Sequence, residues 1–200
     1  MQDIISYITE KYNPVCIILY GSYANATNNS LSDFDCMIVT ENKTIAHDTS
    51  FVGGIQLDLF IYSPDEIASI DCIPLFDAKI VKDSNGIAES LINKAKSYIN
   101  ANSIKPTEKK GSLVSWLNKM LVRAKGDDVE SMFRRCWALT ESLEIYFILR
   151  NRFYFGPKKG ISFLQQNDKK GYELFDEVLK NMNYANFEAW INYVLTTYSE

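Results

Sequence analysis

Residues 15–40 read VCIILYGSYANATNNSLSDFDCMIVT, and this stretch decides the fold of the N-terminal half. An apolar and β-branched run at 15–20 is typical of a buried strand. The run stops at Gly21 and Ser22, a polar loop follows, and a second apolar run at 35–40 predicts another strand. The stretch therefore predicts two strands joined by a loop, with a glycine after the first strand and acidic residues around the start of the second.

Asp33 and Asp35 are the acidic residues at that position. Side chains alternate along a strand, so the two carboxylates project to the same side and repel each other unless a cation lies between them. Mg²⁺ is a hard cation that prefers oxygen ligands of this kind. A third predicted strand at 55–61 (IQLDLFI) contains Asp58, a charge among apolar neighbours that needs a partner. If these strands are adjacent, we expect three carboxylates to converge as ligands for a two-metal phosphoryl transfer.

Gly21 and Ser22 supply a complementary feature. A glycine lets the backbone come close to a phosphate, and the N–H groups that follow, with the Ser22 hydroxyl, can donate hydrogen bonds to it. The chain has no G-x-x-x-x-G-K-[ST] motif, so the sequence does not predict a P-loop protein.

This pattern of strand, Gly-Ser, polar loop, Asp-x-Asp and a later strand aspartate resembles the DNA polymerase β-like nucleotidyltransferase superfamily. Within it, the chain is more similar to the small bacterial minimal and antibiotic nucleotidyltransferases of the kanamycin and lincosamide types. Their usual motif reads G-S-x-A-R-G…S-D-x-D, and Asn25 and Ala26 stand here where Arg and Gly are common. The matching residues are Gly21, Ser22, Ala24, Ser32, Asp33 and Asp35.

The resemblance implies transfer of a nucleoside monophosphate from a nucleoside triphosphate, expected to be ATP, to an acceptor hydroxyl, with release of pyrophosphate. Asp33 and Asp35 are expected to hold two Mg²⁺ ions, and Asp58 to hold the catalytic one and help orient the nucleophile. The expected nucleotide-binding residues are Gly21, Ser22, Ser32 and Lys158. A solvated position after Gly156-Pro157 is the alternative interpretation of Lys158.

The second half reads as long amphipathic helices. The helix predicted at 128–152 is apolar nearly all round, which indicates a central position. Glu141 and Glu144 belong to its thin polar stripe and are candidates for deprotonating an acceptor hydroxyl, a role that a helical glutamate has in the antibiotic enzymes. The alternative is that both glutamates pair with Arg134 or Arg150 for structure.

The small number of histidines and the scattered cysteines argue against other kinds of catalytic or metal site. His47 is the single histidine, falls in a predicted loop and is assigned no role, which disfavours a serine hydrolase triad. The four cysteines are scattered over apolar runs, so we expect buried free thiols in a reducing compartment and no zinc site.

The net charge of −4 argues against binding to long nucleic acid. No run approaches the ~20 apolar residues of a membrane span, and residues 1–12 lack a basic leader, so a cytoplasmic protein is expected.

The expected architecture is α+β. An N-terminal nucleotidyltransferase catalytic domain at 1–103, with a mixed sheet and flanking helices, precedes a C-terminal helical bundle at 104–200 that binds the substrate. The acceptor is expected to be a small molecule such as an aminoglycoside or lincosamide, which implies antibiotic resistance. The alternatives are an antitoxin-type enzyme that adenylylates a partner protein, and a degenerate module that only binds a nucleotide. A homodimer, common among such relatives, is left open.

Overall fold

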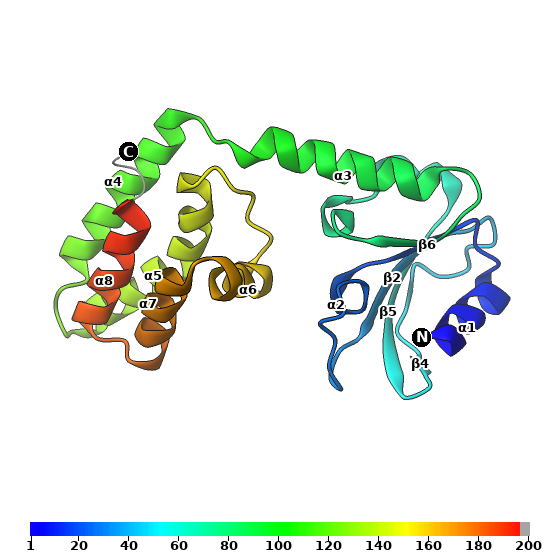
Figure 1. The fold of residues 1–200 in the computed structure, drawn as a ribbon, viewed down its shortest axis with the longest axis horizontal. Coiled ribbons are helices and arrows are strands. Elements are labelled where there is room, and N and C mark those ends of the chain that lie inside the picture. Colours follow the sequence, from blue (N-terminus) through cyan, green and yellow to red (C-terminus); the bar gives the residue numbers. More distant parts are fainter. Residues whose placement is uncertain (197–200) are drawn as a thin grey trace. The chain divides into compact units, whose positions relative to one another are not determined.

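The computed structural model describes residues 1–196. The chain divides into two compact units, Met1–Ile99 and Asn100–Glu200. Helix α3 (Ile87–Ser103) runs out of the first unit, and α4 begins at Thr107. The first unit is built on a sheet and the second on helices, so the predicted α+β class is confirmed (Figure 1).

The sheet of the first unit is mixed. Its strands follow the order β3-β5-β2-β1-β6, and β4 pairs with β5 outside this path. β2 and β5 are parallel and the other pairs are antiparallel. The strands are β1 (Cys16–Leu19), β2 (Phe34–Val39), β3 (His47–Asp48), β4 (Phe51–Val52), β5 (Ile55–Tyr62) and β6 (Lys79–Asp83).

Each face of this sheet is covered by helix, because the central strands are apolar on both sides. On one face Phe34 and Leu59 pack with Ile8 of α1 (Gln2–Tyr12). On the other face Met37 packs with Leu91 of α3 and with residues in and beside the short 3₁₀ helices η1 (Pro64–Ser69) and η2 (Ile73–Leu75). The alternation of side chains along β2 therefore sends successive residues into two separate cores.

The strands predicted at 15–20, 35–40 and 55–61 are confirmed as β1, β2 and β5. The sequence did not predict β3 and β4, because two-residue strands show no alternation. It also did not predict α2 (Gly21–Ala24), a single helical turn directly after β1.

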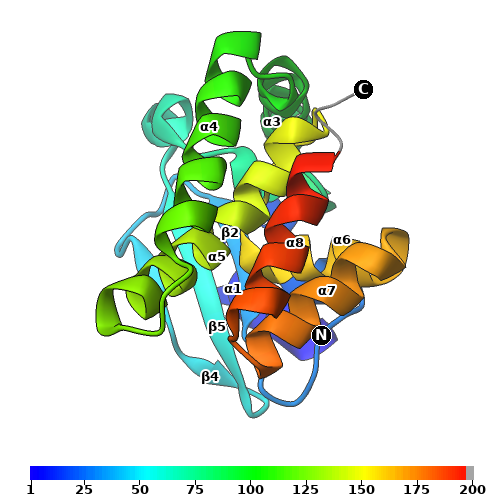
Figure 2. The ribbon, with the colours of Figure 1, turned by 90° about the vertical axis from the view of Figure 1, so that its left-hand side faces the viewer.

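The second unit is helical. Its core is centred on Trp190 and Phe187, both without exposed surface. Figure 2 shows α4, α5 and α8 running alongside one another, with α6 and α7 beside them. The helices are α4 (Thr107–Arg123), α5 (Val129–Leu149), α6 (Pro157–Asn167), α7 (Lys169–Lys180) and α8 (Tyr184–Thr196).

The central position predicted for the helix at 128–152 is correct only for the second half of α5. Phe133 and Trp137, in the first half, are 66% and 46% exposed. The chain turns after α5. Helix α6 then packs back onto α5, with Gly160 of α6 against Leu143 and Phe147. The covering helix therefore reaches the end of α5 rather than its beginning.

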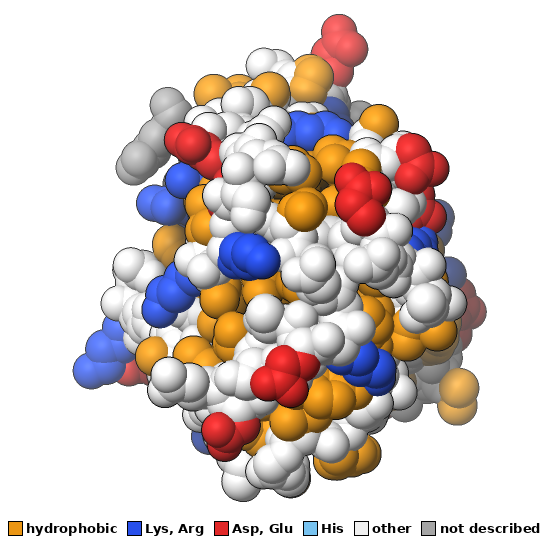
Figure 3. Space-filling view, turned by 90° about the vertical axis from the view of Figure 1, so that its right-hand side faces the viewer, with side chains coloured by type: hydrophobic (Ala, Val, Ile, Leu, Met, Phe, Trp, Pro, Cys, Tyr) orange, Lys and Arg blue, Asp and Glu red, His pale blue; other side chains and the backbone are white. Residues whose placement is uncertain are grey.

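The surface mixes polar and apolar side chains. On the face shown in Figure 3, lysine, arginine, aspartate and glutamate side chains are dispersed among hydrophobic and neutral ones. None of the helices within residues 1–196 combines the length and apolar character that crossing a bilayer requires.

Cys16, Cys36 and Cys72 are buried thiols as expected, but Cys136 is exposed on α5, which corrects the expectation that all four are buried.

Candidate active site

Asp35 and Asp58 are side by side in the sheet. β2 and β5 are parallel, and the two aspartates are register partners. Their neighbours Phe34 and Leu57 point into the core beneath α1, so both carboxylates project from the opposite face. Asp58 is one-third exposed, and Asp35 is half-buried. The register thus brings together two acidic groups from strands separated by a long connection.

Gly21 lies directly against Asp35. Its φ of +67° is in the left-handed region, and a Cβ added at this position would stand 2.1 Å from Oδ2 of Asp35. The backbone N–H of Tyr20, the preceding residue, donates to the Asp35 carbonyl at 3.1 Å. Glycine is therefore required twice, for the backbone conformation and for the space that the carboxylate fills.

Tyr20 extends the row of polar groups across β1, β2 and β5. Its ring packs with the core on the α3 side of the sheet. Burial raises the pKa of the Tyr20 hydroxyl well above its ordinary value, and the negative charges of Asp58 and Asp35 raise it further. The hydroxyl consequently remains protonated, a neutral donor in the vicinity of both carboxylates.

His47 belongs to this site, although the sequence assigned it no role. It lies on β3, beside β5, and its Nε2 is 2.6 Å from Oδ1 of Asp58. Its ring stacks on Phe60 with centroids 4.5 Å apart and planes 18° from parallel. When Asp58 is ionised the carboxylate accepts, so the Nε2–H of His47 donates. Strand β3 contains only His47 and Asp48, and two residues are too few to show the alternation by which a strand is predicted from sequence.

Asp33, Ser32 and Ser22 lie around the same loop. Asp33 is exposed immediately before β2. The Ser32 hydroxyl accepts from the Asn29 N–H at 3.0 Å, so this side chain closes the turn at 29–32. Ser22 is mostly buried within α2. Within residues 1–196, no group of three or more His, Cys, Asp or Glu side chains is gathered into a potential metal site. The close acidic neighbours are therefore the pair on β2 and β5.

Comparison with known families decides what this arrangement belongs to. Residues 2–102 match the family described as Polymerase beta, Nucleotidyltransferase. The chain is a member of the polymerase β nucleotidyltransferase family. This membership confirms the superfamily predicted from the Gly-Ser and Asp-x-Asp motifs, and it supports nucleoside monophosphate transfer as the general activity.

A solved structure, of the nucleotidyltransferase-like protein from Exiguobacterium sibiricum 255-15, is similar with a TM-score of 0.44 and 8% sequence identity. The similarity covers 98% of this chain and 76% of that one. No protein of curated function matches the chain by sequence.

In the helical unit, Glu141 and Glu144 line a cavity of about 360 Å³. The alternative that they pair with Arg134 or Arg150 is wrong. Arg134 pairs with Glu130 on the preceding turn of α5. The guanidinium of Arg150 lies 3.7 Å from the centroid of the Tyr146 ring and donates to backbone carbonyls of α5 and α8.

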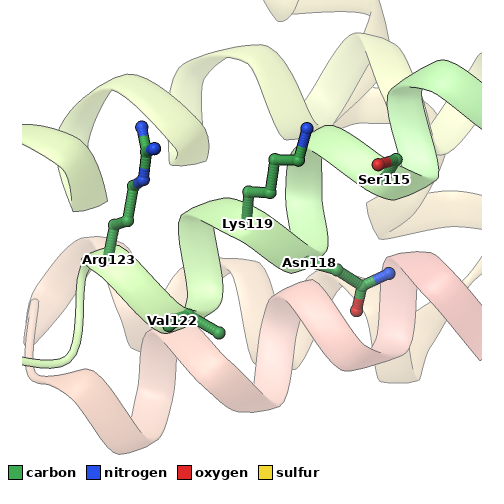
Figure 4. A pocket seen from close by; sticks show the side chains of 5 residues that line it. All are labelled: Ser115, Asn118, Lys119, Val122 and Arg123. Atoms are coloured by element: carbon green, nitrogen blue, oxygen red, sulfur yellow. The ribbon is translucent and has the colours of Figure 1, made fainter.

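Basic residues of this unit lie in two further places. Lys158 is exposed in the first turn of α6, a position that fits a solvated side chain and also one that reaches for a ligand. A hollow of about 470 Å³ lies on α4. Lys119 and Arg123, which line it, project from successive turns of this helix (Figure 4). All the side chains that line this hollow come from one helix, so it is a surface feature with no opposing wall.

Proposed function

We propose that this protein is a Mg²⁺-dependent nucleotidyltransferase that moves a nucleoside monophosphate from a nucleoside triphosphate, with ATP as the first candidate, to an acceptor hydroxyl. The observation that carries the proposal is the pairing of Asp35 with Asp58 on one face of the sheet, with Gly21 against Asp35. Family membership supplies the reaction class. The acceptor oxygen attacks the α-phosphorus, the bond from that phosphorus to the pyrophosphate oxygen breaks, and pyrophosphate leaves.

The acidic residues suit magnesium. Their donors are carboxylate oxygens, and Mg²⁺ in nucleotide enzymes takes one or two carboxylates and completes its shell with phosphate oxygens and water. Asp35 and Asp58 would provide these carboxylates. Asp33, which is exposed immediately before β2, would be a further ligand. Two bound Mg²⁺ ions would neutralise the triphosphate and make the acceptor hydroxyl more acidic.

The chain's own groups bind and orient the nucleotide. The missing side chain at Gly21 leaves the backbone open beside Asp35, where the N–H groups of Gly21 and Ser22 can donate to the β- and γ-phosphates. Ser32 shapes the loop before β2, and we propose that it contributes to nucleotide binding from there. Lys158 is proposed to contribute positive charge to the triphosphate.

The proton of the acceptor hydroxyl needs a base. Glu141 and Glu144 are the candidates in the helical unit, and Asp58, held by His47, is the candidate in the sheet. We propose a small-molecule acceptor such as an aminoglycoside or a lincosamide, which would make the enzyme an antibiotic resistance factor. This acceptor class rests on the motif similarity to enzymes that modify those drugs. Buried free cysteines fit a reducing compartment, so the cytoplasm is the proposed location.

The test follows labelled nucleotide. The protein is incubated with Mg²⁺ and each of the four ribonucleoside triphosphates labelled on the α-phosphate, with an aminoglycoside, a lincosamide or no acceptor. Label on the drug supports the small-molecule proposal, label on protein identifies a protein-modifying enzyme, and no transfer with any acceptor contradicts an active enzyme. Gel filtration with light scattering under the same conditions decides between monomer and homodimer.

Variants connect the activity to the site. Asp35→Asn and Asp58→Asn should each lower transfer by several orders of magnitude, because each removes a carboxylate that would hold Mg²⁺, and thermal melting checks that the variants keep their fold. Asp65→Asn, an exposed aspartate of η1, is the matched control and should behave as wild type. Equal activity of Asp35→Asn and the control would refute the assignment.

A further inference from the structure

The helical unit contains a cavity with apolar walls. It has a volume of about 360 Å³, opens to solvent on one side and is lined by residues of α5, α6, α7 and the segment that precedes α6. Leu143, Ile161 and Phe175 are among the side chains that form its walls. This volume lies at the lower end of the range of small-molecule sites, roughly 300–1,000 Å³. The cavity is therefore large enough for a compact organic molecule and too small for a folded partner.

Gly160 packs against Tyr154 and Leu143, two of the side chains that line this cavity. A Cβ at this position would lie 3.0 Å from Cε2 of Tyr154 and 3.3 Å from Cε2 of Phe147. The absent side chain lets α6 approach α5 closely and fixes where the Tyr154 ring stands. The ring of Tyr154 is thereby held at the cavity that it lines.

Glu141 and Glu144 bring negative charge to the same cavity. They are neighbours on the surface of α5, one turn apart. Both side chains are exposed, and within residues 1–196 neither carboxylate forms a hydrogen bond or an ion pair. Burial raises the pKa of the Tyr154 hydroxyl, and the charges of Glu144 and Glu141 raise it further, which indicates that all three groups are close. Two exposed carboxylates at the edge of an apolar hollow set up a local negative potential, which favours a cation with an apolar body.

We propose that this cavity binds a small organic amine, in which an alkyl or aromatic body fills the apolar part and a protonated amine pairs with Glu141 and Glu144. The Tyr154 ring adds a cation–π face for the ammonium group. A neutral ligand would leave the two carboxylates without a counter-charge, and an anionic one would be repelled by them. This site goes beyond the proposed nucleotide transfer, because binding requires neither a nucleotide nor Mg²⁺.

Calorimetric titration of the full chain at neutral pH, without nucleotide or metal, tests the proposal. The probes are phenylbutylamine, phenylbutanol and phenylpentanoate, which share an aromatic body and differ in the charge of the polar end. The amine should bind at least about tenfold more tightly than the alcohol, with no detectable binding of the carboxylate. Equal affinity for amine and alcohol, or no binding of the amine, overturns the proposal.

The double variant Glu141→Gln, Glu144→Gln tests whether these two carboxylates cause the preference for the amine. It should lose the preference for the amine and bind the alcohol as the wild type does. Glu173→Gln, on α7 and outside the cavity lining, is the control and should retain the preference. Near-ultraviolet circular dichroism checks that both variants keep the native packing. A double variant that is natively packed and still prefers the amine refutes the site.

The cavity and the transferase proposal can fail separately. Amine binding without any nucleotide transfer would support the cavity and contradict the enzyme. Nucleotide transfer that requires Asp35, together with no amine binding, would do the reverse.

Discussion

Nε2 of His47 lies 2.6 Å from Oδ1 of Asp58, and the two residues come from adjacent strands of the sheet. The stacking of the His47 ring on Phe60 fixes the ring plane, so the hydrogen bond holds the Asp58 carboxylate in one orientation. A group that holds a metal ligand in place acts on the metal and on the reaction without touching substrate. We therefore regard His47 as a positioning residue for the proposed metal centre.

Replacing His47 with Phe should keep the stacking and remove the hydrogen bond. Transfer activity should fall by about 10–100-fold, the usual cost of losing a hydrogen bond to a metal ligand. The Mg²⁺ concentration for half-maximal rate should rise, and this shift separates a positioning role from a purely structural one. A Mg²⁺ titration of the transfer rate measures it. His47→Gln, which retains a donor, should recover part of the loss, and an unchanged Mg²⁺ requirement in His47→Phe would contradict the role.

Gly21→Ala should damage the site more than the fold. The new Cβ would meet Oδ2 of Asp35 at 2.1 Å, so the carboxylate must move, and the left-handed backbone adds roughly 1–2 kcal/mol of strain. Gly53→Ala is the matched control, because Gly53 also has positive φ (+59°) but its Cβ would have open space. Both variants carry the backbone strain, so Gly21→Ala should lose more stability than Gly53→Ala in denaturant unfolding by the cost of the clash, and only Gly21→Ala should lose transfer activity. Wild-type activity in Gly21→Ala would disprove the steric argument.

Asp48 should make the first unit sensitive to acid. Burial alone would raise the pKa of this carboxyl, but hydrogen bonds from Ser50, Tyr12 and Lys11 outweigh burial and hold it well below its ordinary value. A folded-state pKa below the unfolded one stabilises the protein above the unfolded pKa, near 4, and this stabilisation is lost as the pH falls below it.

Asp48→Asn should cost about 2–3 kcal/mol at neutral pH, because the buried donors lose a charged acceptor. It should also flatten the fall in stability between about pH 5 and pH 2. Urea unfolding at several pH values measures both effects. Asp65→Asn, which alters an exposed carboxylate, provides the reference. An acid-unfolding profile for Asp48→Asn as steep as that of the wild type would show that the stabilisation lies elsewhere.

Ser142 should be a stability position of the helical unit. Its hydroxyl is fully buried, accepts from Nε1 of Trp190 at 2.7 Å and donates to the Leu139 carbonyl at 2.7 Å. Ser142→Ala leaves the indole N–H buried without an acceptor, which costs about 1–3 kcal/mol. Thr140→Ala, which removes an exposed hydroxyl from the same helix, should change stability much less. Equal melting temperatures for the two variants would exclude this contribution.

Much of the first unit was predictable because its signals are local. The apolar runs that became β1, β2 and β5, and the Gly-Ser and Asp-x-Asp motifs between them, lie within short windows where period and turn residues can be read directly. The same motifs were enough to identify the superfamily. Strands β3 and β4 were not predicted, because a two-residue strand is defined by its pairing with β5 and not by its own sequence.

The helical unit was predictable in its elements and less so in its surfaces. The apolar periodicity of α5 indicated a central helix, but periodicity does not tell which turns a neighbour will cover, and Trp137 remained exposed. Glu141 and Glu144 stood out as a polar stripe, whereas the cavity beside them depends on how α6 and α7 fold back over α5.

Sequence alone was enough for the α+β class, the order of the main strands along the chain, the Asp-x-Asp motif at the start of β2 and the glycine after β1, because each of these shows within a few residues. Only the tertiary structure decided that Asp58 is the register partner of Asp35, that Gly21 faces its carboxylate and that His47 holds Asp58. Those relationships depend on pairing between distant segments. Such pairing follows from the burial of whole sheet faces and helix stripes, a property of the complete fold that no short window of sequence contains.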